Sequence, residues 1–188
     1  MSLRRGLDHL VLAVRNLDQA AARYEACGFT LTPRAQHPWG TANRLVQFDG
    51  SFLELLEIDR PELIAPASVG EFSFGVYVRD FLRRREGFAM LVFEGHDARA
   101  DVAAFAAAGL NTYPPFDFSR SAVLPAGNSA TVGFSLAFVT DPRAPEAVTF
   151  TCQQTAPQYF WKPQFQRHAN GVQGIAAVVM QADRPEQW

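Results

Sequence analysis

Apolar side chains recur along residues 6–17 in a pattern that predicts a strand buried on both faces. Successive side chains of a strand point to opposite faces, so Leu10, Leu12 and Val14 share one face. His9 lies on the other face, together with small apolar residues. We expect the leucine face to pack against a helix and His9 to point to the opposite side of the sheet.

A helix is predicted directly after this strand. Leu17, Ala21 and Tyr24 have the spacing i, i+4 and i+7, which places them on one helical face. Asp18 offers a carboxylate as the N-cap of this helix. Gly28 is expected to end the helix, because glycine readily adopts a positive φ.

Three short strands are predicted after the helix. Asp49 and Gly50 form a hairpin signal between the second and the third of them. The order strand, helix and three strands defines a βαβββ unit. The three strands are predicted at residues 30–36, 41–49 and 51–58.

The chain repeats this unit. A shift of 81 positions aligns glycines, prolines and apolar strand residues without a gap, as in Gly6 with Gly87 and Gly28 with Gly109. A shift of 165 positions aligns the first strand again, as in Val14 with Val179. The sequence therefore predicts an α+β fold of tandem βαβββ units that form a cupped mixed sheet, plus the first strand of a third unit.

These repeats divide the chain into four parts. The part that follows the first unit contains a connecting helix predicted at residues 72–86. The part that follows the second unit contains a short helix predicted at residues 156–168. The parts are 1–59 for the first unit, 60–86 for a loop and the connecting helix, 87–155 for the second unit, and 156–188 for a helix and the incomplete third unit.

The strand of the third unit, residues 172–180, is apolar and lacks the rest of its unit. An unpaired apolar strand favours aggregation, so we expect it to pair with a sheet edge of this chain or of a second copy. A homodimer is therefore expected. The repeat stops at Trp188, which leaves open whether the sequence is a fragment of a longer protein.

Charge, hydropathy and cysteine content indicate which partners and which cellular compartment to expect. The formal net charge of −2 argues against nucleic acid as a partner, which requires a concentrated basic surface. No apolar stretch reaches the roughly 20 residues of a membrane helix, and no secretory signal precedes residue 6. Two cysteines, Cys27 and Cys152, form no disulfide framework. We expect a cytoplasmic protein.

Four short motifs carry a family resemblance. DHLV lies in the first strand and FLELL in the fourth, and the other two are HPWGTANR and FQRHANG, at residues 8–11, 52–56, 37–44 and 165–171. With the tandem units, they resemble the vicinal oxygen chelate superfamily and its glyoxalase-like domain branch. The resemblance implies a cup that holds a divalent metal, with ligands from the first and fourth strands of each unit. It also implies a substrate that chelates the metal through neighbouring oxygens, and a metal that stabilises an enolate or an oxyanion.

His9 and Glu54 are the first candidates for this chemistry. Glu54 stands in the middle of an apolar strand, where an unpaired carboxylate is costly. We expect His9 and Glu54 to be metal ligands, or Glu54 to be a general base. The second unit has Met90 in the place of His9, and its strand at residues 148–152 carries no carboxylate. A complete ligand set would therefore require His37, His168 or residues of further units.

A second interpretation of the site requires no metal. Asn43 and Gln47 share one face of the third strand, on the side expected for Glu54. Together with His37, Trp39 and Arg44, they are the candidate substrate-binding residues. Several polar groups around an apolar pocket are typical of a small-molecule site.

Two functions remain open, besides a scaffold role in which the active site lies in units that this sequence does not contain. The first is a glyoxalase-like protein that binds a small oxygen-rich or partly apolar molecule, with metal-assisted lyase or isomerase chemistry. The alternative is a metal-free protein that binds or sequesters a small molecule, as resistance proteins of this superfamily do. The sequence specifies neither the substrate, the reaction nor the metal.

Overall fold

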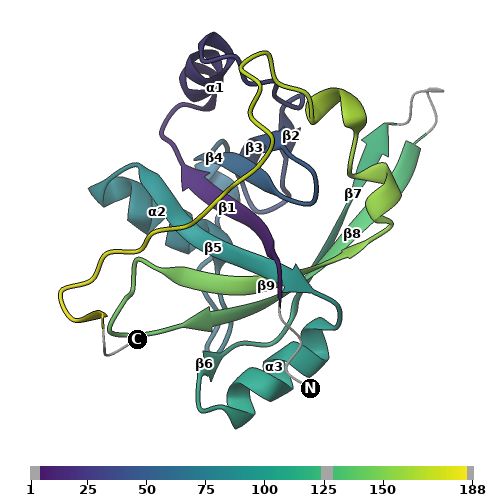
Figure 1. The fold of residues 1–188 in the computed structure, drawn as a ribbon. Coiled ribbons are helices and arrows are strands. Elements are labelled where there is room, and N and C mark those ends of the chain that lie inside the picture. The colour runs from purple at the N-terminus through teal and green to yellow at the C-terminus, as the bar shows by residue number, and fades with distance from the viewer. Residues whose placement is uncertain (1–4, 124–128, 186–188) are drawn as a thin grey trace.

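A computed structural model of the protein describes residues 5–123 and 129–185. Within these ranges the chain forms one mixed sheet of nine strands, accompanied by three α-helices (Figure 1). The helices are α1 (Leu17–Ala26), α2 (Phe74–Arg84) and α3 (Ala98–Ala107). The strands are β1 (Leu7–Ala13), β2 (Ala35–Gln36), β3 (Thr41–Gln47), β4 (Phe52–Ile58), β5 (Gly87–Gly95), β6 (Asn111–Thr112), β7 (Phe116–Val123), β8 (Ser129–Thr140) and β9 (Val148–Thr155).

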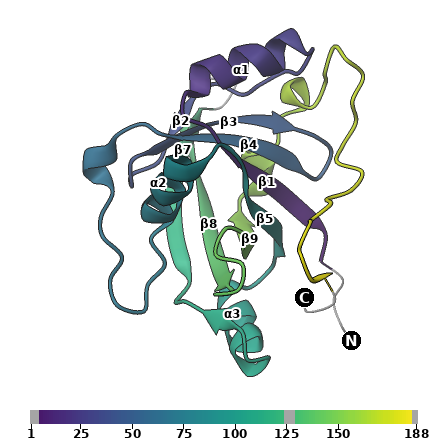
Figure 2. The same ribbon diagram turned by 90° about the vertical axis from the view of Figure 1, so that its left-hand side faces the viewer.

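Two similar halves make up the sheet. The strand order is β2-β3-β4-β1-β5-β9-β8-β6, and β7 pairs with β8. In each half the first strand runs parallel to the last, β1 with β4 and β5 with β9, and the halves join where β1 and β5 pair antiparallel. Figure 2 shows the two halves turned toward each other, with α1 over the first and α3 beside the second. The predicted α+β fold of tandem βαβββ units in a cupped mixed sheet is confirmed.

Each face of the first half packs a different apolar cluster. The outer cluster packs α1 on the sheet, and it contains Leu17 and Ala21 from the helix and Ala42, Val46 and Leu55 from the strands. The inner cluster lies in the cup and packs α2 against the opposite face of the same strands. This alternation confirms that Ala42 and Val46 face a helix while Asn43 and Glu54 face the cup.

The ends of α1 correct one prediction and confirm another. Asn16, not Asp18, is the N-cap, and its side chain accepts a hydrogen bond from Gln19 N at 2.8 Å. Asp18 lies in the first turn, where its negative charge interacts favourably with the helix dipole. Gly28 follows the C-cap with a φ of +83°, as predicted.

The other predicted local elements are mostly present. Gly50 has a φ of +76° in the turn between β3 and β4, and the connecting helix is present as α2. The helix expected at 156–168 is instead two short 3₁₀ turns, Pro157–Tyr159 and Pro163–Phe165, each beginning with a proline. A proline has no N–H for an intrahelical bond, so one continuous helix does not form. In the described ranges no helix combines the length and the hydropathy that a membrane span requires.

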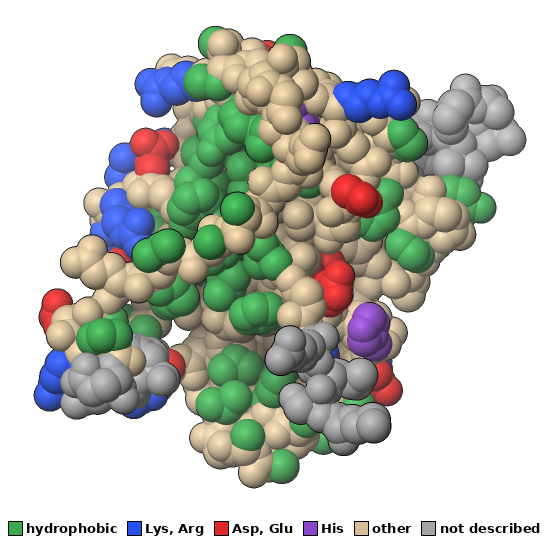
Figure 3. Space-filling view, viewed as in Figure 1, with side chains coloured by type: hydrophobic (Ala, Val, Ile, Leu, Met, Phe, Trp, Pro, Cys, Tyr) green, Lys and Arg blue, Asp and Glu red, His purple; other side chains and the backbone are tan. Residues whose placement is uncertain are grey.

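Residues 172–180 do not form the expected paired strand within this chain. All of them lie in the described part of the chain, and none has strand structure. The segment crosses the outer face of the sheet near β1 and β5, where Figure 3 shows apolar side chains gathered beside it. Since β1 already pairs with β4 and β5, it offers no free edge to a strand that lies above it. Val179 remains 91% exposed.

The FQRHANG motif is a clasp, which we define as residues 165–171. His168 Nδ1 accepts a hydrogen bond from Thr30 N at 3.0 Å, and its Nε2 donates to Gln47 O at 2.9 Å. Asn170 Nδ2 donates to Cys27 O at 2.9 Å. The clasp therefore fastens the C-terminal segment to the end of α1 and to β3.

Gly28 is predicted to matter for the clasp as well as for its own backbone conformation. A Cβ at position 28 would lie 3.0 Å from the backbone N and the Cβ of Asn170. A Cβ at Gly50, which also has a positive φ, would meet nothing within 4 Å. In urea unfolding we expect Gly50→Ala to lose about 1 kcal/mol from its backbone conformation alone. Gly28→Ala should lose about 2 kcal/mol or more, and equal losses would contradict a tight clasp.

Candidate functional site

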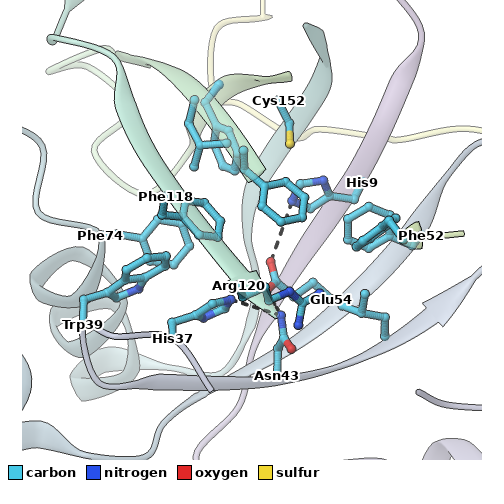
Figure 4. Close-up of a pocket in the computed structure, with 15 residues that line it drawn as sticks. His9, His37, Trp39, Asn43, Phe52, Glu54, Phe74, Phe118, Arg120 and Cys152 are labelled. Carbon is cyan, nitrogen blue, oxygen red and sulfur yellow. Dashed lines mark hydrogen bonds and ion pairs between the residues drawn. The ribbon is translucent and has the colours of Figure 1, made fainter. Parts of the chain in front are cut away.

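A cavity of about 50 Å³ lies in the cup between the two halves of the sheet. A volume of this size holds a few water molecules or part of a small ligand. Figure 4 shows the polar side chains of Asn43 and Glu54 between aromatic side chains, with Phe118 on one side and Phe52 on the other. The lining residues are His9, His37, Trp39, Asn43, Leu45, Phe52, Glu54, Phe74, Phe118, Arg120, Phe134, Leu136, Phe150, Cys152 and Phe160.

A bulge in β1 places the Asp8 carboxylate next to the His9 ring. The pairing of β1 with β5 shifts register between Leu7 and His9, so Asp8 is an extra residue on β1. The Asp8 carboxylate turns back and accepts a hydrogen bond from His9 Nδ1 at 2.5 Å. Gln154 Nε2 donates to the other oxygen of Asp8 at 3.0 Å. In a neutral imidazole this bond fixes the tautomer, and Nε2 is left as an acceptor toward the cavity.

Glu54 lies beside His9 and is only 6% exposed. Its Oε1 accepts a hydrogen bond from Asn43 Nδ2 at 2.6 Å. Its Oε2 lies 3.7 Å from His9 Nε2, which is too long for a hydrogen bond. One carboxylate oxygen is therefore held by the protein, while the other has no hydrogen-bond partner among the described residues.

His37 completes the polar wall in a neutral form. Burial, and then the positive charge of Arg120, lower the pKa of His37 to about 3. Its Nε2 lies 3.5 Å from Asn43 Nδ2 and its Nδ1 lies 2.8 Å from Thr41 Oγ1. Because the Asn43 amide is a donor, the neutral ring accepts at Nε2 and donates from Nδ1. His37 thus orients the amide that holds Glu54.

Sequence reasoning did not identify Arg120, a pocket residue of the second half. Phe116, Phe118 and Arg120 alternate along β7 and so share a face, and two of the three line the cavity. Burial lowers the pKa of the guanidinium, and the negative charge of Glu54 partly opposes this shift. The sequence signal that could have identified Arg120 is its position two residues after Phe118, on the same face of a strand as two phenylalanines.

The cavity also contains Cys152, whose thiol stays protonated. Burial raises the pKa of this thiol well above its usual value, and the charges of Asp8 and Glu54 raise it further. Cys152 therefore contributes an apolar wall rather than a thiolate nucleophile.

The predicted site residues divide into those that meet in the cavity and those that do not. His9, His37, Trp39, Asn43 and Glu54 all line it. Arg44 and Gln47 do not line it.

The expected place of Arg44 in the pocket is wrong. It lies on the opposite face of β3, where Nε donates to Thr32 O at 2.9 Å and a terminal nitrogen donates to Glu25 Oε1 at 2.8 Å. Strand alternation directs the side chain of Arg44 away from the cup, because both of its neighbours on β3 face the other side.

Gln47 faces the cup but does not line the cavity. Its amide donates to Phe160 O at 3.1 Å and accepts from Lys162 N at 3.2 Å. Gln47 therefore holds the turn that carries Phe160 into the cavity, and its polar atoms are engaged by the protein.

The comparisons with known proteins now bear on this geometry. The sequence model of the glyoxalase-like domain family matches residues 7–188. The chain belongs to the glyoxalase-like domain family. No curated protein sequence matches it significantly.

Solved structures of low sequence identity share the fold of this glyoxalase-like domain. A hypothetical protein from Bacillus halodurans is 17% identical, with a TM-score of 0.58 over 80% of this chain and 95% of its own. The methylmalonyl-CoA epimerase of Streptomyces coelicolor is 19% identical, with a TM-score of 0.56 over 80% of this chain and 95% of its own. A methylmalonyl-CoA epimerase in complex with methylmalonyl-CoA and NH4+ is 21% identical, with a TM-score of 0.58 over 82% of this chain and 97% of its own. These likenesses show the vicinal oxygen chelate fold.

The side chains in the cup do not complete the metal site that this fold implies. The strand registers place Met90 where the first half has His9, and Phe150 where it has Glu54. His168 is held in the clasp. Across residues 5–123 and 129–185, no cluster of three His, Cys, Asp or Glu side chains could hold an ion. The donor set therefore does not fit a resident divalent metal with three or more protein ligands.

The buried, neutral His37 predicts a stability that falls in acid. The unfolded chain binds a proton at this residue below about pH 6.5, whereas the folded chain binds it only near pH 3. The unfolded state therefore binds more protons between these values, and the free energy of unfolding falls as the pH falls through this window. The limiting slope from one such group is about 1.4 kcal/mol per pH unit.

We expect His37→Gln to remove this contribution. Urea unfolding of both proteins at about pH 7 and about pH 4.5 measures it as the difference between the two pH values, so that any loss of the variant at pH 7 cancels. An unchanged pH dependence in His37→Gln would contradict a neutral His37 in the folded chain.

Proposed function

We propose that this glyoxalase-like domain binds a small carbonyl compound with an apolar body in the cavity and that Glu54 exchanges a proton with it. The observation that carries the proposal is that only one of the two carboxylate oxygens of Glu54 accepts a hydrogen bond from the described residues. Oε1 is fixed by Asn43 at 2.6 Å, while Oε2 accepts no hydrogen bond from the described residues and lies at the cavity. A carboxylate held on one side and free on the other is suited to general base catalysis.

The surroundings of Glu54 support proton transfer. His9 Nε2 lies 3.7 Å from Glu54 Oε2, so a small movement would bring the two groups within hydrogen-bond distance. Asp8 holds the His9 ring from behind, and Phe52 stacks on it at a centroid distance of 4.2 Å. Rigid, largely dehydrated groups lose little energy to rearrangement during the reaction.

The second half of the cup supports a partly apolar ligand. Phe118, Phe134, Leu136 and Phe150 form its wall, and Phe160 closes one side. A wall of this kind gains affinity by removing apolar ligand surface from water. The methylmalonyl-CoA complex of the similar epimerase supports a carbonyl compound as the ligand class.

A sequestering protein is the second candidate function. The observation that favours it is the replacement of metal-ligand positions by Met90 and Phe150, which turns half of the cup into an apolar surface. Such a protein would bind the ligand without exchanging a proton.

Hydrogen exchange at carbon tests the proposal. The protein is incubated in D2O with pyruvate, 2-oxobutyrate or phenylpyruvate, and loss of the ¹H NMR signal next to the carbonyl is followed against a sample without protein. We expect Glu54→Gln to slow the exchange by about 100-fold or more, because general bases contribute on this scale. The matched control is Glu57→Gln, on the same strand but outside the cavity.

Three results are informative. Exchange that survives in Glu54→Gln would contradict the role of this carboxylate. Ligand-induced shifts in the protein spectrum without any exchange would favour the sequestering function. Neither shifts nor exchange with any of the three compounds would reject the proposed ligand class.

A further inference from the structure

We propose that Arg120 supplies the positive charge that stabilises the oxyanion of the ligand, in place of a metal ion. The inference rests on the proposed function, since the oxyanion forms only when Glu54 removes a proton. It also restricts the proposed ligands to carbonyl compounds whose enolate oxygen can reach the Arg120 guanidinium.

Arg120 differs from the other partly buried arginines. Each of the others donates a hydrogen bond to a carboxylate or carbonyl oxygen, whereas Arg120 donates to no residue in the described ranges. The arginines with a partner are Arg5, Arg44, Arg60 and Arg79. Desolvating a guanidinium without hydrogen bonds is costly. The unused donors of Arg120 are therefore available to a ligand.

The surroundings of Arg120 direct it toward the reacting position. It lines the same cavity as Glu54, and Figure 4 shows it beside Glu54 and His37. Its guanidinium carbon lies 5.9 Å from the centre of the Phe134 ring, which is within reach of a cation–π contact. The neutral His37 adds no competing charge on that side. A ligand in the cavity would therefore meet the base and the cation close together.

The proton transfer balances without another reactant. Glu54 Oε2 takes a proton from the carbon next to the carbonyl, and the electron pair of that C–H bond becomes the C=C bond of an enolate. The π pair of the carbonyl moves to oxygen, which then carries the negative charge that Glu54 has lost. Arg120 faces one negative charge before and after the step, so no charge is left unpaired. Return of the proton to the carbon restores the carbonyl compound.

The asymmetry of the two halves supports this assignment. The second half lacks metal ligands at the positions of Met90 and Phe150 but has Arg120 on β7. A fixed cation in a cavity walled by aromatic side chains stabilises a developing oxyanion much more strongly than it would in water.

Oxalate tests the inference, because this planar anion resembles the enolate of pyruvate. Its binding to the EDTA-treated protein is measured by isothermal titration calorimetry. We expect Arg120→Met to weaken binding by about 30-fold, since hydrogen bonds to charged groups contribute on this scale. Arg120→Lys, which keeps the charge, should retain part of the affinity. Glu54→Gln should bind oxalate at least as tightly as the unaltered protein, because a negative charge is removed.

Arg44→Met is the matched control, because Arg44 is also partly buried but lies on the outer face of β3. Thermal unfolding of every variant shows that the fold is intact, and Arg120→Gln replaces Arg120→Met if the latter does not fold. Three results would overturn the inference. Oxalate could bind equally well to the unaltered protein and to Arg120→Met and Arg120→Gln. It could fail to bind the protein both with and without EDTA treatment, or it could bind only after a divalent metal is added.

The same variants separate this inference from the proposed function. Exchange that depends on Glu54 but not on Arg120 would support the function and reject the role of Arg120. Oxalate binding that depends on Arg120, in a protein that exchanges no proton, would reject the function and confirm Arg120 as an anion site.

Discussion

The antiparallel pairing of β1 with β5 is the contact on which the cup depends. It joins two halves that each close their own parallel pair, β1 with β4 and β5 with β9, and so brings side chains from both halves around one cavity. The same pairing contains the bulge at Asp8, which allows adjacent residues of one strand to form the Asp8–His9 hydrogen bond. The joint between the halves is therefore also the support of the site.

The site combines charges with a wall that excludes water. Glu54 and Arg120 would attract each other weakly on a wet surface, where solvent screens them. In the cavity, Phe118 and Phe150 replace much of that solvent. The hydrogen bond from Asn43 keeps the carboxylate of Glu54 from turning. The apolar half of the cup therefore strengthens the electrostatic interaction between Glu54 and Arg120.

Local patterns predicted the fold and half of the site because strand alternation and turn chemistry are properties of neighbouring residues. The alternation that placed Asn43 in the cup also directs Arg44 outward, so the sequence already contained that correction. Arg120 was missed because its neighbours come from strands far away in the sequence, and only the register of β7 on β8 brings it to Glu54. The pattern of residues 172–180 is that of a strand, but a strand also requires a free edge.

Divergence between the two halves explains how a duplicated fold can hold an unsymmetrical site. A metal site with ligands from both halves requires matching donors, and the second half has Met90 and Phe150 at these positions. Glu54 is a buried carboxylate, which is stable only with a nearby positive charge or hydrogen-bond donors. Asn43 supplies the donor and Arg120 the charge. These two groups therefore make the buried Glu54 tolerable.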